Sequence, residues 1–136
     1  MATPIAASRP KNRAKGIAMK EITSIDGLKT CLDETAEKAA FLFKHSTTCP
    51  ISSRAHARVS DYIASAPAGV PEFRMIKVIE SRSVSNAVAK ELGVMHQSPQ
   101  IVLVLDGKAV WSASHHHISP KSIAQAIEEC LPASAS

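Results

Sequence analysis

The stretch FKHSTTCPIS, residues 43–52, places a single cysteine directly before a proline. A histidine and three hydroxyl residues precede the cysteine, and the spacing of apolar residues changes from that of a strand to that of a helix here. Proline suits the first turn of a helix because its missing N–H has no partner to lose there. The stretch therefore predicts that Cys49 stands at the N-terminus of a helix beginning at Pro50.

Apolar residues on both sides of Cys49 support this prediction. The run 39–43 contains two phenylalanines and predicts a short buried strand that ends at Lys44-His45. After Pro50, apolar residues recur at helical spacing on one face: Ile51, Ala55, Val59, Tyr62 and Ile63.

The rest of the chain alternates between strand and helix patterns, without an internal repeat. Thr23 or Ser24 can cap a first helix. Gly93 is suited to end a later one, and Asp106-Gly107 suits a two-residue hairpin turn. In chain order we expect a short strand near 19–22, a helix within 22–36, the strand and helix around Cys49, a strand over 73–80, a helix over 84–92, a hairpin of strands 100–105 and 108–114, and a final helix with an apolar stripe of Ile123, Ile127, Cys130 and Leu131.

This order of elements resembles the thioredoxin-like arrangement. It predicts an α/β fold, a three-layer sandwich around a mixed central sheet. In that arrangement the helix after the first core strand carries the reactive cysteine, and a cis-proline that starts the hairpin faces it. Cys49 and Pro99 occupy these two places.

The charge of the chain is uneven. Among 136 residues, enough for one domain, the net charge is +4, yet five of the 16 Lys/Arg lie in the first twenty residues, which hold no acid. The remainder has 11 basic and 12 acidic residues. We expect a flexible basic tail over residues 1–18, a domain over 19–132, and no nucleic-acid partner, because the domain shows no basic cluster.

The cysteines and the apolar runs indicate the compartment. Three widely spaced cysteines without a CxxC pair are typical of a reducing environment. No apolar run is long enough to span a membrane, and nothing resembles a secretory leader. We therefore expect a cytoplasmic protein with no membrane partner.

Cys49 is the candidate nucleophile. The N–H groups of Ile51 and Ser52 can point at its sulfur and, with the helix dipole, favour the thiolate. The hydroxyls of Thr47 and Thr48 are further candidate donors. The residue three after the nucleophile, a cysteine in dithiol thioredoxins, is Ser52 here. A mixed disulfide on Cys49 must therefore be resolved by an external thiol or by another cysteine.

The other two cysteines are most simply core residues. Cys130 lies on the apolar stripe of the last helix. Cys31 shares a helical surface with Leu28 and Leu32. A second hypothesis for Cys31 is that it is the resolving thiol.

Three blocks of sequence resemble the YtxJ-type monothiol bacilliredoxins, thioredoxin-fold proteins of the bacillithiol redox system. They are KHSTTCPIS (44–52), ESRSVSNAVAKELGVMHQSPQ (80–100) and DGKAVWSASH (106–115). The resemblance extends from about residue 20 to 131. It implies a monothiol thiol-disulfide oxidoreductase.

The resemblance also implies roles for individual residues. Cys49 would take bacillithiol from S-bacillithiolated proteins through a mixed disulfide, and Pro99 with its neighbouring backbone would shape the substrate groove. His45 would tune the thiol or transfer a proton. The expected partners are S-thiolated proteins and bacillithiol or a related small thiol, with no tightly bound cofactor and no metal. The predicted substrate-binding or thiol-tuning set is His45, Thr47, Thr48, Pro50, Ser52 and Pro99.

Other classes remain as alternatives. A peroxiredoxin would have serine or threonine three residues before the cysteine and proline seven before it; Ser46 fits, but Leu42 does not. A cluster-carrying monothiol glutaredoxin would show CGFS in place of CPIS. Residues 115–117, three histidines, suggest with His45 and Cys49 a non-enzymatic metal module, although adjacent histidines on a strand end alternate sides. An inert Cys49 would leave a thioredoxin-fold adaptor.

Overall fold

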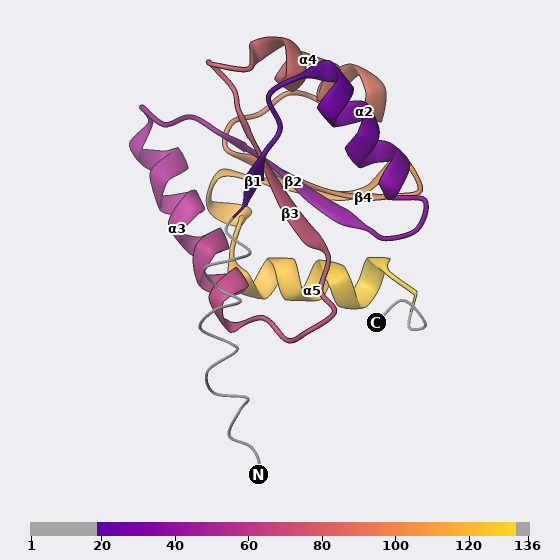
Figure 1. The fold of residues 1–136 in the computed structure, drawn as a ribbon. Coiled ribbons are helices and arrows are strands. Elements are labelled where there is room, and N and C mark those ends of the chain that lie inside the picture. Colours follow the sequence, from indigo (N-terminus) through magenta and orange to yellow (C-terminus); the bar gives the residue numbers. More distant parts are fainter. Residues whose placement is uncertain (1–18, 133–136) are drawn as a thin grey trace.

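The computed structural model describes residues 19–132, which form a five-stranded mixed sheet with helices on both faces (Figure 1). The sheet order is β1-β3-β2-β4-β5. The tail predicted over residues 1–18 lies outside the described residues. The elements are β1 (Lys20–Glu21), α2 (Ile25–Glu34), β2 (Ala40–His45), α3 (Pro50–Ser65), β3 (Glu72–Lys77), α4 (Arg82–Leu92), β4 (Gln100–Leu105), β5 (Lys108–Ser114), the 3-10 turn η1 (His115–His117) and α5 (Pro120–Cys130).

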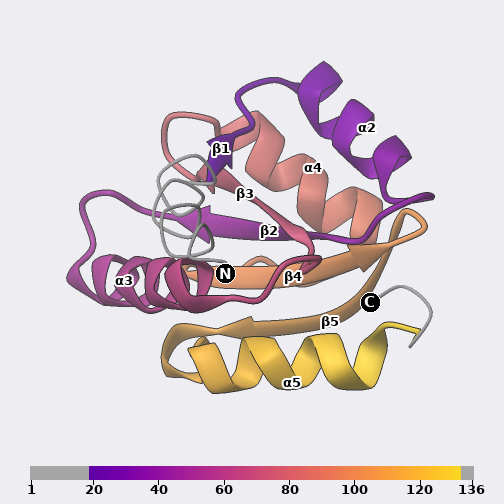
Figure 2. The same ribbon diagram turned by 60° about the horizontal axis from the view of Figure 1, so that its bottom comes forward.

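The central strand β2 divides the molecule into its layers. It runs parallel to β3 and antiparallel to β4, and all six of its residues are buried. Because side chains alternate along a strand, Phe41 and Phe43 enter one core and Leu42 the other. Figure 2 shows α3 and α5 covering the first face of the sheet and α2 and α4 covering the second.

Local signals in the sequence account for several boundaries. Ser24 caps α2, accepting a hydrogen bond from the Gly27 N–H at 3.0 Å. Gly93 ends α4 with a left-handed φ of 66°. Asp106 and Gly107 have φ values of 55° and 71°, as a two-residue hairpin turn requires. The predicted short first strand is also present as β1.

One predicted strand boundary is wrong, and the three histidines that follow the correctly predicted strand 108–114 do not lie on a strand end. The strand expected over 73–80 ends at Lys77, because the chain turns there and the Ser81 N–H donates to the Lys77 carbonyl at 2.8 Å. Residues 115–117 do not extend a strand but form η1. The guanidinium of Arg58 holds this turn by donating to the carbonyls of Ile118 (2.6 Å) and His115 (3.1 Å).

Candidate functional site

Cys49 is the N-cap of α3, directly after the loop that leaves β2. Its side chain is partly exposed, and its carbonyl accepts the first helical hydrogen bond, from the Ser53 N–H at 3.0 Å. The sulfur itself receives no capping hydrogen bond, so the predicted donation from the amides of Ile51 and Ser52 is not present. The position at the positive end of a 16-residue helix remains.

Ser52, which stands where a dithiol protein has its second cysteine, is fully buried behind Cys49. Its Oγ accepts a hydrogen bond from the Ser46 N–H at 2.9 Å and lies 2.7 Å from Nδ1 of His45. One hydroxyl therefore joins the end of β2, the Cys49 loop and the first turn of α3.

His45 is held in a stacked, buried position. Its side chain is 7% exposed, and its ring packs against those of Phe43, with centroids 5.6 Å apart, and His56, at 4.9 Å. Burial lowers the pKa of His45 below its ordinary value; His56 and Lys77 lower it further and Glu80 opposes them. The imidazole is consequently neutral at pH 7 and keeps one nitrogen free to accept a hydrogen bond.

The threonines before Cys49 bind other groups. Thr47 Oγ1 donates to the Glu80 carboxylate at 3.5 Å, and Thr48 Oγ1 lies 3.4 Å from the Ser46 hydroxyl. The first contact ties the Cys49 loop to the turn between β3 and α4. Neither threonine hydroxyl is hydrogen-bonded to the sulfur in this conformation.

Pro99 lies at the same end of the sheet as Cys49. The Ser98–Pro99 peptide bond is cis, as the thioredoxin-like arrangement predicts. The next residue, Gln100, pairs with Lys44 in the antiparallel β2–β4 ladder, and this pairing brings the hairpin start to the end of β2. A cleft of about 580 Å³ starts beside Pro99, and its lining includes Met95, Gln97, Gln100, Trp111 and Ser114.

Cys31 and Cys130 are not brought to Cys49. Cys31 is 2% exposed in the core beneath α2 and α4, on the other face of the sheet, and burial raises the pKa of its thiol. It lines a pocket with Ala40, the first residue of β2, whereas Cys49 follows the last, and six strand residues span about 20 Å. Cys130 packs against the core of α3 and α5. The placement of Cys31 therefore does not support a resolving role.

Several polar residues near the site were missed by sequence reasoning. Lys44 is fully buried on the α4 side of β2, with Nζ 3.0 Å from Nδ1 of His96. Burial lowers the pKa of Lys44 to about 8. Glu80 and His56 also face the site through their contacts with Thr47 and His45. The position of Lys44 within a predicted buried strand could have indicated its burial. Its partner His96 could not be identified in this way, because it lies 52 residues away in the sequence.

Among residues 19–132, no three His, Cys, Asp or Glu side chains gather to hold a metal ion. In the 3-10 turn, the rings of His116 and His117 stack on each other with centroids 4.2 Å apart. In the same part of the chain, no helix has the length and apolar character needed to cross a membrane.

A single cysteine that caps a helix, backed by a buried serine and far from any second thiol, defines a monothiol protein of the thioredoxin fold. The family model described as monothiol bacilliredoxin BrxC matches residues 20–123. The chain belongs to this family, which gives it a role in thiol redox chemistry.

Solved structures agree with this fold. A thioredoxin-fold protein proposed to be an oxidoreductase is 32% identical, with a TM-score of 0.73; the match covers 83% of this chain and 96% of that one. A thioredoxin from Malassezia sympodialis is 15% identical, with a TM-score of 0.66 and coverages of 83% and 90%. Mitochondrial thioredoxin 3 from Saccharomyces cerevisiae is 17% identical, with a TM-score of 0.63 and coverages of 82% and 94%.

Proposed function

We propose that this protein is a monothiol thiol-disulfide oxidoreductase that removes bacillithiol from S-bacillithiolated proteins. The observation that carries the proposal is the isolation of a partly exposed Cys49 at the N-cap of α3, with Ser52 at the position of a second cysteine. Cys49 is the catalytic residue. Cys31 lies in the core on the α2 and α4 face of the sheet, and the partly buried Cys130 packs against the core on the other face.

The reaction is two thiol-disulfide exchanges. The Cys49 thiolate attacks the bacillithiol sulfur of the thiolated protein, so that a bond forms between these two sulfurs and the bond to the substrate cysteine breaks. The substrate leaves as a thiolate and takes a proton from solvent. A second bacillithiol thiolate then attacks the same bacillithiol sulfur, which releases Cys49 as a thiolate and forms oxidised bacillithiol.

The residues around Cys49 have supporting roles in this proposal. Because Ser46 N–H occupies one lone pair of Ser52 Oγ, the hydroxyl proton is free to donate to Nδ1 of neutral His45. His45 is then a positioning residue that fixes the first turn of α3, and Thr47 fixes the loop. Pro99 and its neighbouring backbone border the groove that takes the thiolated segment. The second exchange needs a reduced small thiol, which places the reaction in a reducing compartment, the cytoplasm.

The test is the intact mass of the protein after incubation with oxidised bacillithiol, and in parallel with oxidised glutathione, followed by peptide mapping. We expect one bacillithiol adduct on Cys49, formed faster than the glutathione adduct. Cys49→Ser should abolish it, whereas Cys31→Ser and Cys130→Ser should react at the wild-type rate. A disulfide between Cys49 and Cys31, or an adduct in Cys49→Ser, would refute the monothiol mechanism.

A further inference from the structure

Among residues 19–132, Lys44 is a buried cation without a carboxylate partner. Its side chain is fully buried in β2. In the same range of residues, Lys44 makes no hydrogen bond and no ion pair with an aspartate or glutamate. Within the described part of the chain, its one hydrogen-bond partner is Nδ1 of His96, at 3.0 Å. Lysine is almost never fully buried unless it is paired with an opposite charge, so an anion bound at His96 would stabilise the ammonium of Lys44.

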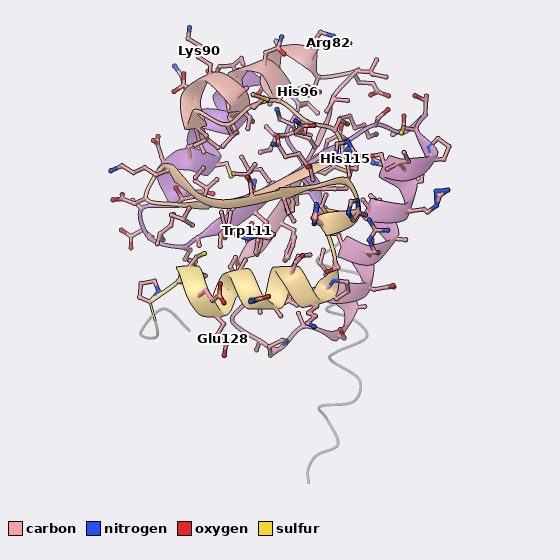
Figure 3. All side chains as sticks on the ribbon, turned by 180° about the vertical axis from the view of Figure 1, so that it is seen from behind. Arg82, Lys90, His96, Trp111, His115 and Glu128 are labelled. Atoms are coloured by element: carbon pink, nitrogen blue, oxygen red, sulfur yellow. The ribbon has the colours of Figure 1, made fainter. Side chains whose placement is uncertain are left out.

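A second cation lies beside the same histidine. Arg82, the first residue of α4, is exposed, and within the described chain it makes no ion pair. The pKa of His96 is lowered by burial and then by Lys44 and Arg82, with no acid opposing them. Figure 3 shows Arg82 above His96, with Lys90 at the opposite end of α4.

The contact with Lys44 determines which ring nitrogen of His96 carries the proton. An ammonium group can only donate hydrogen bonds, so Nδ1 of His96 must accept and its ring proton must be on Nε2. The His96 side chain is exposed, so this Nε2–H is available to a ligand. Together with the guanidinium of Arg82 it offers donors of the kind that bind a carboxylate.

This cluster borders the Cys49 loop. Lys44 lies five residues before Cys49 in the chain, and His96 lies three before Pro99. Arg82 follows the β3–α4 turn, whose Glu80 carboxylate accepts a hydrogen bond from Thr47 at 3.5 Å. Glu80 is the acid of this region, and its charge acts on His45 rather than on His96.

We propose that Arg82 and Nε2 of His96, supported from behind by the ammonium of Lys44, bind a carboxylate of the small thiol while its sulfur is exchanged on Cys49. The inference rests on the proposed function and deepens it. It makes the co-substrate an anionic small thiol such as bacillithiol, which carries carboxylates. An uncharged disulfide reaches Cys49 without using this subsite.

The experiment compares an anionic and an uncharged disulfide on the same protein. The rate of mixed-disulfide formation on Cys49 is measured with oxidised bacillithiol and with hydroxyethyl disulfide, for wild type, Arg82→Gln, Arg82→Lys and Lys90→Gln. Loss of a charge-assisted contact should slow the bacillithiol reaction of Arg82→Gln about tenfold. The reaction with hydroxyethyl disulfide should change less than about twofold. Arg82→Lys should recover part of the rate, and Lys90→Gln, which removes the same charge at the far end of α4, should behave as wild type.

A second readout reports on His96 directly. In Cys49→Ser protein, the ring nitrogen resonances of His96 should show the Nε2–H form and should shift when reduced bacillithiol is added. If Arg82→Gln leaves both the bacillithiol and the hydroxyethyl disulfide rates unchanged, or slows both equally, the subsite is refuted while the proposed function stands. A wild-type protein that forms no bacillithiol adduct would overturn both.

Discussion

Replacing the buried lysine should make the protein more stable and less active. Lys44→Met keeps the length and the apolar stem of the side chain and removes the charge that burial disfavours. Burial lowers the pKa of Lys44 from 10.5 to about 8, and one pKa unit corresponds to about 1.4 kcal/mol. The shift sets an upper limit of about 3 kcal/mol on the gain. The lost contact with His96 is replaced by water at an exposed ring, so we expect a net gain of about 1–3 kcal/mol at pH 7.

The sign of the pH dependence gives a sharper test. Below pH 8 the lysine is protonated in both the folded and the unfolded wild type, so it adds no slope there. Between pH 8 and 10.5 the unfolded chain binds more protons, and the wild type gains stability as the pH rises. Lys44→Met lacks this gain. The advantage of the variant should therefore be largest near pH 7 and should vanish towards pH 10.5.

Urea unfolding of wild type, Lys44→Met and Lys90→Met between pH 7 and 10 measures these differences. Lys90 is an exposed lysine on α4, and its replacement should change stability by less than about 0.5 kcal/mol at every pH. The same Lys44→Met protein should lose rate with oxidised bacillithiol and not with hydroxyethyl disulfide. A variant less stable than wild type at pH 7, or a difference independent of pH, would refute the reasoning.

Two further predictions concern the residues behind Cys49. Ser52→Ala removes two hydrogen bonds at a buried position and should cost about 2 kcal/mol in urea unfolding; Ser53→Ala, on the same turn but exposed, should cost less than about 0.5 kcal/mol, and equal costs would disprove the role of the Ser52 hydroxyl. His45 and His56 both have pKa values lowered by burial, so the unfolded chain binds their protons first and stability should fall as the pH drops below about 6.5. His56→Phe should flatten this loss between pH 6.5 and 5, and an unchanged slope would exclude His56 as a source.

The parts of the fold that follow from short-range pattern could be predicted from the sequence. The hairpin at Asp106-Gly107, the end of α4 at Gly93 and the helix start after Cys49 each depend on the preferences of one or two residues. The end of β3 could not be predicted in this way. The apolar residues Val78 and Ile79 continue the strand pattern, while the backbone has already turned at Lys77 to form the bond with Ser81.

For a related reason, only the part of the candidate site formed by neighbouring residues could be predicted from the sequence. Cys49 and Ser52 are three residues apart, so a helix places them on the same side whatever the rest of the chain does. The pairing of Lys44 with His96 and the bonds from Arg58 to Ile118 and His115 join residues more than 50 positions apart, and only the tertiary packing of the chain brings them together. The position of Cys31 likewise depends on which face of the sheet α2 covers. Helical spacing does not contain that information.

The two sides of the site make opposite contributions to the stability of the fold. On the α3 side, Ser52 and His45 satisfy each other within a buried network, which stabilises the first turn that presents Cys49. On the α4 side, Lys44 is buried at a cost to folding, and its hydrogen-bond partner in the described structure is the imidazole of His96. A chain selected for stability alone would have an apolar residue at position 44, as at Phe41, Leu42 and Phe43. A charge retained there against its burial cost points to a ligand that repays it in the second exchange, when an anionic thiol must approach a sulfur already bonded to Cys49.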